Sequence, residues 1–297
     1  MKVVSLLDRP SGAAFRGSDQ VNQARLLALS DIRGLGDLCD AGSRVATIAG
    51  VFAQRGYPRG VFPLIYRIGL DAVAAALNKG RFRDPEWVQT FEIAFASRYL
   101  DNLHRHLTEA RTTVPWAAVY SRVDNETTTI AGTLTAALSA HLISDLPEAL
   151  HASDVRAHHF VDFFALSRLI WGTAPDAIAA VKSGYGADLS PLCSAQLQIW
   201  LVIVLAGRVP STQEQLFHSI TGVAFASGYA MANPLARPLI RAHIASSSQA
   251  ASGLADQLIN LAQLRPSHRW APSRDGVGTD LASAATRPNK HIAPLGH

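Results

Sequence analysis

The sequence predicts an all-α protein, a single multi-helix, bundle-like domain with a largely irregular C-terminal tail. Apolar residues recur three and four positions apart through most of the chain, which is the spacing of one helical face. The alternation and hairpin turns that mark β-strands are missing from the sequence. With 297 residues, 48% of them of hydrophobic type, the chain is long enough to bury a large core.

The composition divides the chain into three parts. Residues 1–20 show no clear period and are expected to form a flexible arm, and residues 21–264 are expected to form the helical domain. Pro, Ser, Arg, Gly and Thr dominate residues 265–297, so we expect an irregular or mobile tail there. Helices are predicted over residues 21–29, 45–52, 62–77, 85–107, from 116 onward, 131–150, 154–171, 175–182, 192–206 and 212–232, with one or two more within 234–262.

Some helix boundaries are marked by residues that favour helix ends. Asp84 is a candidate N-cap, and Pro85 suits the first helical position because its missing N–H is not needed there. Asp40 or Ser43 is expected to cap the helix that carries Val45. These signals place the starts of two core helices.

The composition also excludes several classes of protein. The net charge is +4 and the basic residues are scattered without interleaved aromatics, so a nucleic-acid partner is not expected. Cys39 and Cys193 lack the CxxC spacing of a zinc knuckle and are expected to be reduced thiols. The P-loop, HExxH and GxSxG motifs are absent.

The apolar stretches are short. The N-terminal run is broken by Asp8 and Arg9, too early for a signal peptide. The most apolar window, residues 197–207, is too short to cross a bilayer. We therefore expect a cytoplasmic protein without a membrane span.

The strongest functional signal lies in the helix predicted over residues 131–150. His141 and Asp145 are four residues apart and share a helical face with Leu138, so two ionisable groups lie within an apolar stripe. Such groups are rarely buried without a partner or a task. Pro147 follows closely and predicts that the helix ends or bends just past the pair.

Three interpretations of this pair remain open. Asp145 could orient and charge-stabilise His141, leaving the other ring nitrogen free as a general acid or base, with no cofactor required. The pair could instead bind a divalent metal ion, with Asp162 of the next helix as a further ligand. The third interpretation is a structural ion pair that fixes helix register. A salt bridge, for example with His159 three residues away, is the competing interpretation for Asp162.

Other residues are candidates for contact with a substrate. Arg98 and Tyr99 are expected to position or polarise it, although Arg98 could equally be an anchor paired with Asp145 or Asp162. Tyr66 could place its hydroxyl in a pocket. The aromatic residues that would make such a pocket apolar include Phe62, Phe95, Phe160, Phe163 and Trp200.

Four stretches of the chain, residues 62–66, 80–88, 95–99 and 137–147, resemble a bacterial all-α family of unknown function, the domain family numbered 5995. Its hallmark is Asn-Ala-His-Ile followed closely by Asp-Leu. Here Ser139 stands at the Asn position, Leu142 stands at the Ile position, and His141 and Asp145 are kept.

The resemblance covers roughly residues 45–205 and implies an all-α fold but no established reaction. It keeps Asp84, Arg98 and Tyr99. Ser139 and Ser167 both replace an asparagine of the family, so the resemblance implies that they belong to an altered polar site. Such a change would fit a diverged member recruited to a tailoring step in biosynthesis.

These features together favour an enzyme of small-molecule biosynthesis. A small hydrophobic substrate would lie in an apolar pocket between helices, and His141 with Asp145 would catalyse cyclisation, isomerisation, elimination or dehydration. A metal-dependent hydrolase or oxygenase and a non-catalytic helical binding protein are the alternatives. The sequence leaves a homodimer open.

Overall fold

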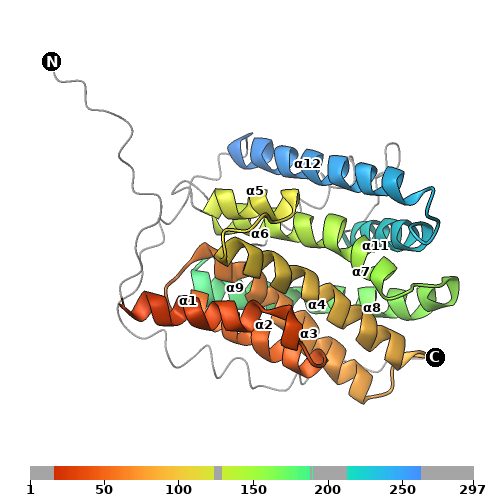
Figure 1. Ribbon diagram of the computed structural model, residues 1–297, viewed down its shortest axis with the longest axis horizontal. Helices are drawn as coiled ribbons and strands as arrows, with labels where there is room; N and C mark the ends of the chain where they lie inside the picture. The colour runs from red at the N-terminus through yellow and green to blue at the C-terminus, as the bar shows by residue number, and fades with distance from the viewer. Residues whose placement is uncertain (1–16, 124–128, 188, 190–212, 262–297) are drawn as a thin grey trace.

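The computed structural model describes residues 17–123, 129–187, 189 and 213–261, and all regular structure in this part is helical (Figure 1). The all-α prediction is therefore confirmed. The α-helices are α1 Gly17–Ser30, α2 Leu38–Ala53, α3 Val61–Asn78, α4 Pro85–Leu107, α5 Val114–Val123, α6 Ile130–Ser139, α7 Leu146–Ala152, α8 Phe160–Gly172, α9 Ala174–Tyr185, α11 Gln213–Ala230 and α12 Arg237–Leu261. The helix predicted over 192–206 and the tail over 265–297 lie outside the described residues.

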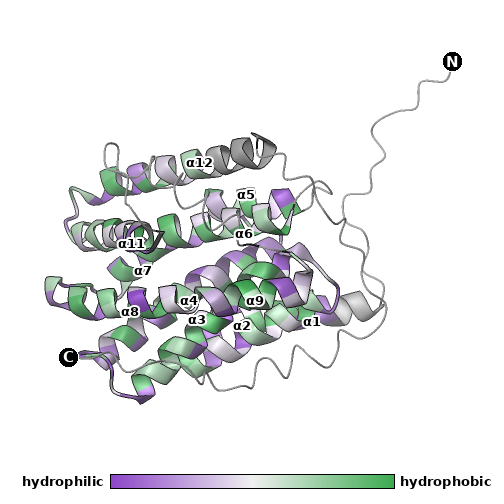
Figure 2. Ribbon diagram, turned by 180° about the vertical axis from the view of Figure 1, so that it is seen from behind, coloured by the Kyte–Doolittle hydropathy of each residue, from purple (hydrophilic) through white to green (hydrophobic). Residues whose placement is uncertain are grey.

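The helices lie roughly side by side, with α12 along one edge of the molecule and α1 and α2 toward the other (Figure 1). Helix α3 packs against α2, α6, α8 and α9, and much of it has the green of hydrophobic residues in Figure 2. Among the described residues, one helical stretch, Pro58–Asn78, is long and apolar enough to cross a membrane by length and composition. Its packing among four helices accounts for that composition, because a helix at the centre of a bundle is apolar on most of its circumference.

The start of α4 follows the sequence prediction. The Asp84 carboxylate accepts a hydrogen bond from the Trp87 backbone N–H at 3.0 Å, and Pro85 is the first helical residue. The predicted N-cap of α2, Asp40 or Ser43, was wrong. Asp37 caps this helix, and its carboxylate accepts a hydrogen bond from the Asp40 N–H at 2.8 Å. Asp40 lies in the first turn, where it pairs with Arg44 at 2.9 Å.

The predicted central helix is one continuous helical run with a wide turn in its middle. Between α6 and α7, Ala140–Asp145 forms a π-helical turn, η3, in which the Leu146 N–H donates to the His141 carbonyl. Pro147 follows at the start of α7. Proline lacks the N–H for an i→i−4 bond and its ring clashes with the carbonyl four residues earlier, so a wider turn before it relieves both problems.

The helix predicted from residue 154 begins later. Asp154 has φ 52°, a left-handed conformation that interrupts the helix, and a short 3-10 turn, η4 Ala157–His159, leads into α8.

Helix α11 packs closely against α7. A Cβ added at Gly228 of α11 would lie 2.6 Å from Leu150 Cβ, so this contact requires glycine.

Candidate functional site

His141, Asp145 and Trp116 form a hydrogen-bonded chain inside the protein. The Trp116 Nε1–H donates to Asp145 Oδ2 at 2.7 Å, and His141 Nδ1 lies 3.2 Å from the same oxygen. Both His141 and Asp145 are 3% exposed. A carboxylate only accepts, so Nδ1 carries the proton in this contact and Nε2 carries the lone pair.

Aromatic rings enclose the imidazole. The Phe95 ring stacks on it with centroids 3.7 Å apart and planes 11° apart, while Tyr66 and Phe62 approach edge-on at 4.7 and 5.1 Å. Desolvation lowers the pKa of His141, and the hydrogen bond to Asp145 partly opposes this. The ring is therefore neutral at neutral pH, and its Nε2 has no hydrogen-bond partner among the described residues.

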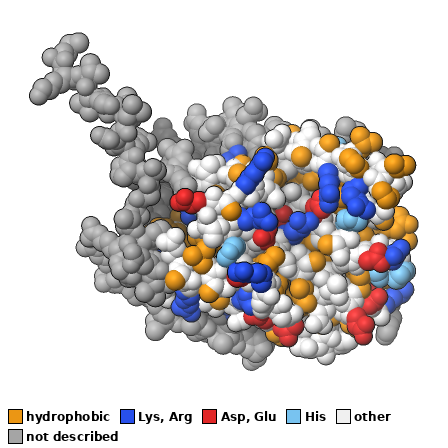
Figure 3. All heavy atoms as spheres, viewed as in Figure 1, with side chains coloured by type: hydrophobic (Ala, Val, Ile, Leu, Met, Phe, Trp, Pro, Cys, Tyr) orange, Lys and Arg blue, Asp and Glu red, His pale blue; other side chains and the backbone are white. Residues whose placement is uncertain are grey.

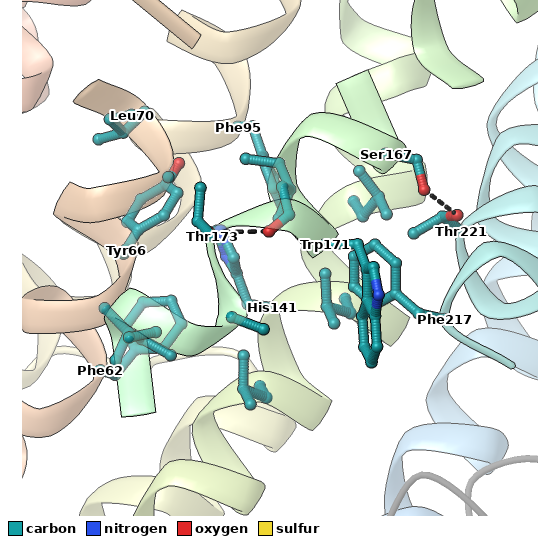
Figure 4. A pocket seen from close by; sticks show the side chains of 18 of the residues that line it. Phe62, Tyr66, Leu70, Phe95, His141, Ser167, Trp171, Thr173, Phe217 and Thr221 are labelled. Carbon is teal, nitrogen blue, oxygen red and sulfur yellow. Dashed lines mark hydrogen bonds between the residues drawn. The ribbon is translucent and has the colours of Figure 1, made fainter. Parts of the chain in front are cut away.

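His141 lines a cavity of about 260 Å³ between α3, α4, α6, α8, α9 and α11. Figure 4 shows His141, Phe62, Tyr66 and Phe95 on one side of this cavity and Ser167, Thr221, Trp171 and Phe217 on the other. Most of the lining side chains are apolar. The size approaches the lower end of small-molecule sites, which begin at about 300 Å³.

Two further polar groups, Glu92 and Tyr66, lie in the cavity wall. Glu92 is 3% exposed, and burial raises the pKa of its carboxyl to about 8. Tyr66 has no hydrogen-bond partner for its hydroxyl among the described residues, and desolvation, with the nearby Glu92 charge, raises its pKa well above the usual 10.0. Glu92 was missed from the sequence, although its spacing of four from Val88 and three from Phe95 places it on the buried face of α4.

A separate hydroxyl cluster lies across the cavity. Ser167 Oγ lies 2.9 Å from Thr221 Oγ1 and 2.8 Å from His218 Nδ1. Thr221 Oγ1 also donates to the His218 carbonyl at 3.1 Å. These groups are largely bonded to one another, so they offer a ligand fewer free donors than the His141 side does.

Of the other residues proposed for the site, Phe163 lines the cavity, but several do not. Phe160 points outward from α8 and is 47% exposed, so it is not part of the lining. Ser139 is fully buried, yet it does not line the cavity and its Oγ has no partner among the described residues. Tyr99 is buried behind the lining, where its ring packs 5.1 Å from Phe62. Trp200 lies outside the described residues.

Arg98 has a partner other than the predicted Asp145 or Asp162. Its guanidinium donates to Glu148 of α7 at 3.1 Å, and Arg241 of α12 binds the same carboxylate at 2.7 Å. This bridge joins α4, α7 and α12, and its side chains are partly exposed. Figure 3 shows that basic and acidic side chains are intermixed on the face that it draws. Arg98 is thus an anchor between helices and does not line the cavity.

Asp162 is also used elsewhere. Its two carboxylate oxygens accept the backbone N–H groups of Arg83 at 2.9 Å and Asp84 at 2.7 Å, and it does not line the cavity. The metal alternative that joins Asp162 to His141 and Asp145 is therefore not supported by their placement. Asp162 instead holds the loop that begins α4.

One group of potential metal ligands occurs in the described part of the chain, formed by Asp84, His158 and His159. His159 Nδ1 accepts the Arg156 N–H at 3.0 Å, so its Nε2 carries the proton and lies 3.4 Å from Asp84 Oδ2. A metal at Nε2 would have to displace that proton while Nδ1 stays bonded. The donor set therefore fits a structural hydrogen bond better than a metal.

Comparison with known proteins gives one result. The profile of a family of unknown function, DUF5995, matches residues 40–203, which contain α3 to α9 and the His141 turn. No curated protein and no solved structure matches the chain.

Proposed function

The chain belongs to DUF5995, a family of unknown function, and we propose from the geometry of its site that it is an acid–base enzyme of small-molecule biosynthesis. A small hydrophobic substrate occupies the cavity beside His141, and His141 moves a proton on it. The reaction class that fits is isomerisation, cyclisation or elimination, because each needs a proton transfer and no cofactor.

The unpartnered Nε2 of His141 carries this proposal. A neutral imidazole whose Nδ1–H is held by Asp145 has its tautomer and orientation fixed, and Nε2 is left as the basic atom. When Nε2 takes a proton, the imidazolium lies beside the Asp145 carboxylate, which stabilises the new charge. Trp116 holds that carboxylate in place.

The apolar lining also bears on the chemistry. With few dipoles in the wall, charges that develop in the cavity are poorly screened, so the His141–Asp145 contact is stronger there than in water. The same lining excludes water that would compete for a reactive intermediate. A mostly hydrocarbon substrate is the complement of such a wall.

A non-catalytic carrier of a hydrophobic compound is the second candidate. It is favoured by the Phe95 ring, which covers one face of the imidazole at 3.7 Å and restricts access to it. In a carrier, the His141–Asp145 pair would serve only to fix the turn between α6 and α7. Ligand retention without conversion would distinguish this candidate.

The test uses the purified protein and an apolar extract of cells that produce it. The extract is incubated with protein in D₂O, and mass spectrometry follows compounds that are converted or take up deuterium. The variant is His141→Gln, and the matched control is His243→Gln, on an exposed position of α12. Unfolding curves establish that both variants fold.

We expect conversion by the wild type and by H243Q, and a loss of at least about 100-fold in H141Q, the usual contribution of a general base. Conversion by H141Q at the wild-type rate would exclude His141 as the base. Compounds that are retained by the protein but never converted would replace the enzyme with the carrier.

A further inference from the structure

Two polar side chains of the cavity wall take no part in the hydrogen-bonded chain of His141, Asp145 and Trp116. Tyr66 extends from α3 and Glu92 from α4, and both line the cavity. No described residue hydrogen-bonds to the Tyr66 hydroxyl. Burial alone accounts for the changed pKa of Glu92, with no charged or hydrogen-bonding neighbour contributing.

Both groups are neutral donors at neutral pH. The Glu92 carboxyl, with a pKa of about 8, keeps its proton at pH 7, and the Tyr66 phenol keeps its own. A protonated carboxyl has an O–H to donate, which an ionised one lacks. Glu92 lies one turn before Phe95 on α4, and the Phe95 and Tyr66 ring centroids are 6.0 Å apart, so the two donors line the same region of the cavity.

Buried donors without partners are unfavourable unless a ligand binds them. On the basis of the proposed function, we propose that Tyr66 and Glu92 together bind the carbonyl oxygen of the substrate, an apolar ketone, aldehyde or enone with a hydrogen on the carbon next to the carbonyl. The substrate class follows from the donors, because an oxygen that only accepts satisfies both.

The placement also defines a reaction step. Tyr66 lies 4.7 Å from the imidazole of His141 between ring centroids, and Phe95, three residues after Glu92, stacks on that imidazole. In the proposed complex, the carbonyl oxygen lies at Tyr66 and Glu92 and the neighbouring C–H faces His141. Neutral donors also avoid the desolvation that a permanent charge would suffer in this apolar wall.

In this step, His141 Nε2 takes the proton from the carbon, and the electron pair of the C–H bond forms a C=C bond. The carbonyl π electrons move to oxygen, where the Tyr66 and Glu92 hydroxyls stabilise the enolate. The imidazolium then returns the proton to the same carbon or, in an unsaturated substrate, to a more distant one. The first outcome is exchange and the second is isomerisation, and neither needs an oxidant or a cofactor.

The hydroxyl cluster across the cavity serves this purpose less well. Ser167 and Thr221 lie 2.9 Å apart and bond to each other, and Ser167 also bonds to His218. Their position opposite His141 in Figure 4 would hold a carbonyl away from the base. The Tyr66–Glu92 side is thus the better oxygen site.

A matched pair of probes tests the proposal with the full chain. 1-Tetralone carries a carbonyl and an exchangeable C–H, and tetralin is the same bicyclic skeleton without the oxygen. A cavity of 150 Å³ holds benzene, so about 260 Å³ accommodates a bicyclic ring. Calorimetry measures both affinities, infrared spectroscopy follows the carbonyl stretch of bound ¹³C-tetralone, and NMR in D₂O follows exchange at the carbon next to the carbonyl.

The variants are Tyr66→Phe and Glu92→Met, which remove one donor each, and Glu92→Gln, which keeps an N–H donor. We expect 1-tetralone to bind at least tenfold more tightly than tetralin and its carbonyl stretch to move to lower wavenumber. Y66F and E92M should each lose about tenfold in tetralone affinity and reverse part of the infrared shift, as expected for one hydrogen bond. E92Q should keep most of the affinity, and tetralin affinity should stay within twofold in every variant, which also shows that the variants fold.

Equal affinities for the two probes, or binding of neither, would overturn the inference. The proposed function would still stand if His141-dependent conversion persisted in the cell extract. If 1-tetralone binding depends on Tyr66 and Glu92 but exchange does not depend on His141, the proposed oxygen site stands. The proposed role of His141 as the base is then wrong.

Discussion

Trp116 and Asp145, 29 residues apart in the chain, are joined by a buried hydrogen bond of 2.7 Å from the indole N–H to Oδ2. The same oxygen is the contact of His141 Nδ1. The imidazole is therefore positioned by α5 as well as by its own helical turn. The rigidity of the candidate site depends on a tertiary contact in addition to the local His141–Asp145 spacing.

The Trp116→Phe variant should lose this donor and leave the Asp145 carboxylate with one partner. Because a buried acceptor without its donor costs about 1–3 kcal/mol, we expect a loss of that size in the free energy of unfolding measured with urea. Trp87→Phe is the matched control, since Trp87 is similarly buried and its Nε1 has no partner among the described residues. Equal losses in the two variants would mean that the bond to Asp145 contributes little.

Glu92→Gln should make the protein more stable at high pH. The carboxyl has a pKa of about 8 in the folded protein and 4.5 ordinarily, so the unfolded chain ionises first and wild-type stability falls as pH rises from about 4.5 to 8. At 1.36 kcal/mol per pKa unit the full effect is at most about 5 kcal/mol. Urea unfolding of both proteins across this range should show a difference that grows with pH and levels off above 8; a constant difference would place the Glu92 carboxyl in a more polar setting.

The exchange of 1-tetralone should have a bell-shaped dependence on pH. His141 must be neutral to take a proton, and its pKa is lowered from 6.5, so the rate should rise with pH on a limb below 6.5. Glu92 must keep its proton to donate, so the rate should fall through about pH 8. NMR exchange rates measure both limbs, and E92Q should lose only the alkaline one. An alkaline limb that persists in E92Q would belong to another group.

Replacing each of two glycines of α11 by alanine should change the stability of the protein in opposite directions. Gly228→Ala would place a Cβ 2.6 Å from Leu150 Cβ and 2.9 Å from the Pro147 carbonyl oxygen, so it should destabilise by about 1–3 kcal/mol. Gly222→Ala meets nothing within 4 Å and should stabilise by about 0.5–1 kcal/mol through helix propensity. Thermal unfolding compares the two, and a stable G228A would mean that α11 is not held tightly on α7.

Asp162→Ala should destabilise the protein by about 2–4 kcal/mol, because the amides of Arg83 and Asp84 lose their acceptor. Hydrogen exchange at these two amides should accelerate locally. Asp101→Ala, which removes only an i,i+4 pair with Arg105 on a half-exposed face, should cost under about 1 kcal/mol. If exchange at Arg83 and Asp84 is unchanged in D162A, the loop has another source of support.

Most of the described helices and the start of α4 could be predicted because their signals are local. Asp84 and Pro85 lie within one turn of the helix they start, and α4 begins where they predict. The burial of His141 and Asp145 likewise follows from the spacing of their apolar neighbours. At the start of α2 both predicted caps, Asp40 and Ser43, were wrong, because the folded loop places Asp37 at the cap.

The rest of the site depends on contacts between distant parts of the chain. Nothing in the residues around Trp116 shows that its indole reaches Asp145, and nothing around Arg98 shows that Glu148, 50 residues later, binds it. Phe160 was expected in the lining because α8 is apolar on most sides, and such a helix does not reveal which side faces the cavity. Glu92 had a readable position on α4, yet an acidic residue in a helix is ordinarily assigned to the solvent side.

The wide turn at Ala140–Asp145 holds one residue more per turn than the helices on either side of it. Removing a single amino acid there would restore the regular i→i−4 pattern and change the placement of the residues within the turn, while α7 would keep nearly its present orientation because the wide turn absorbs one extra residue. His141 and Asp145 would then no longer face the same partners, while most of the bundle could still assemble. The proposed site is thus separated from a plain helical scaffold by the loss of one codon.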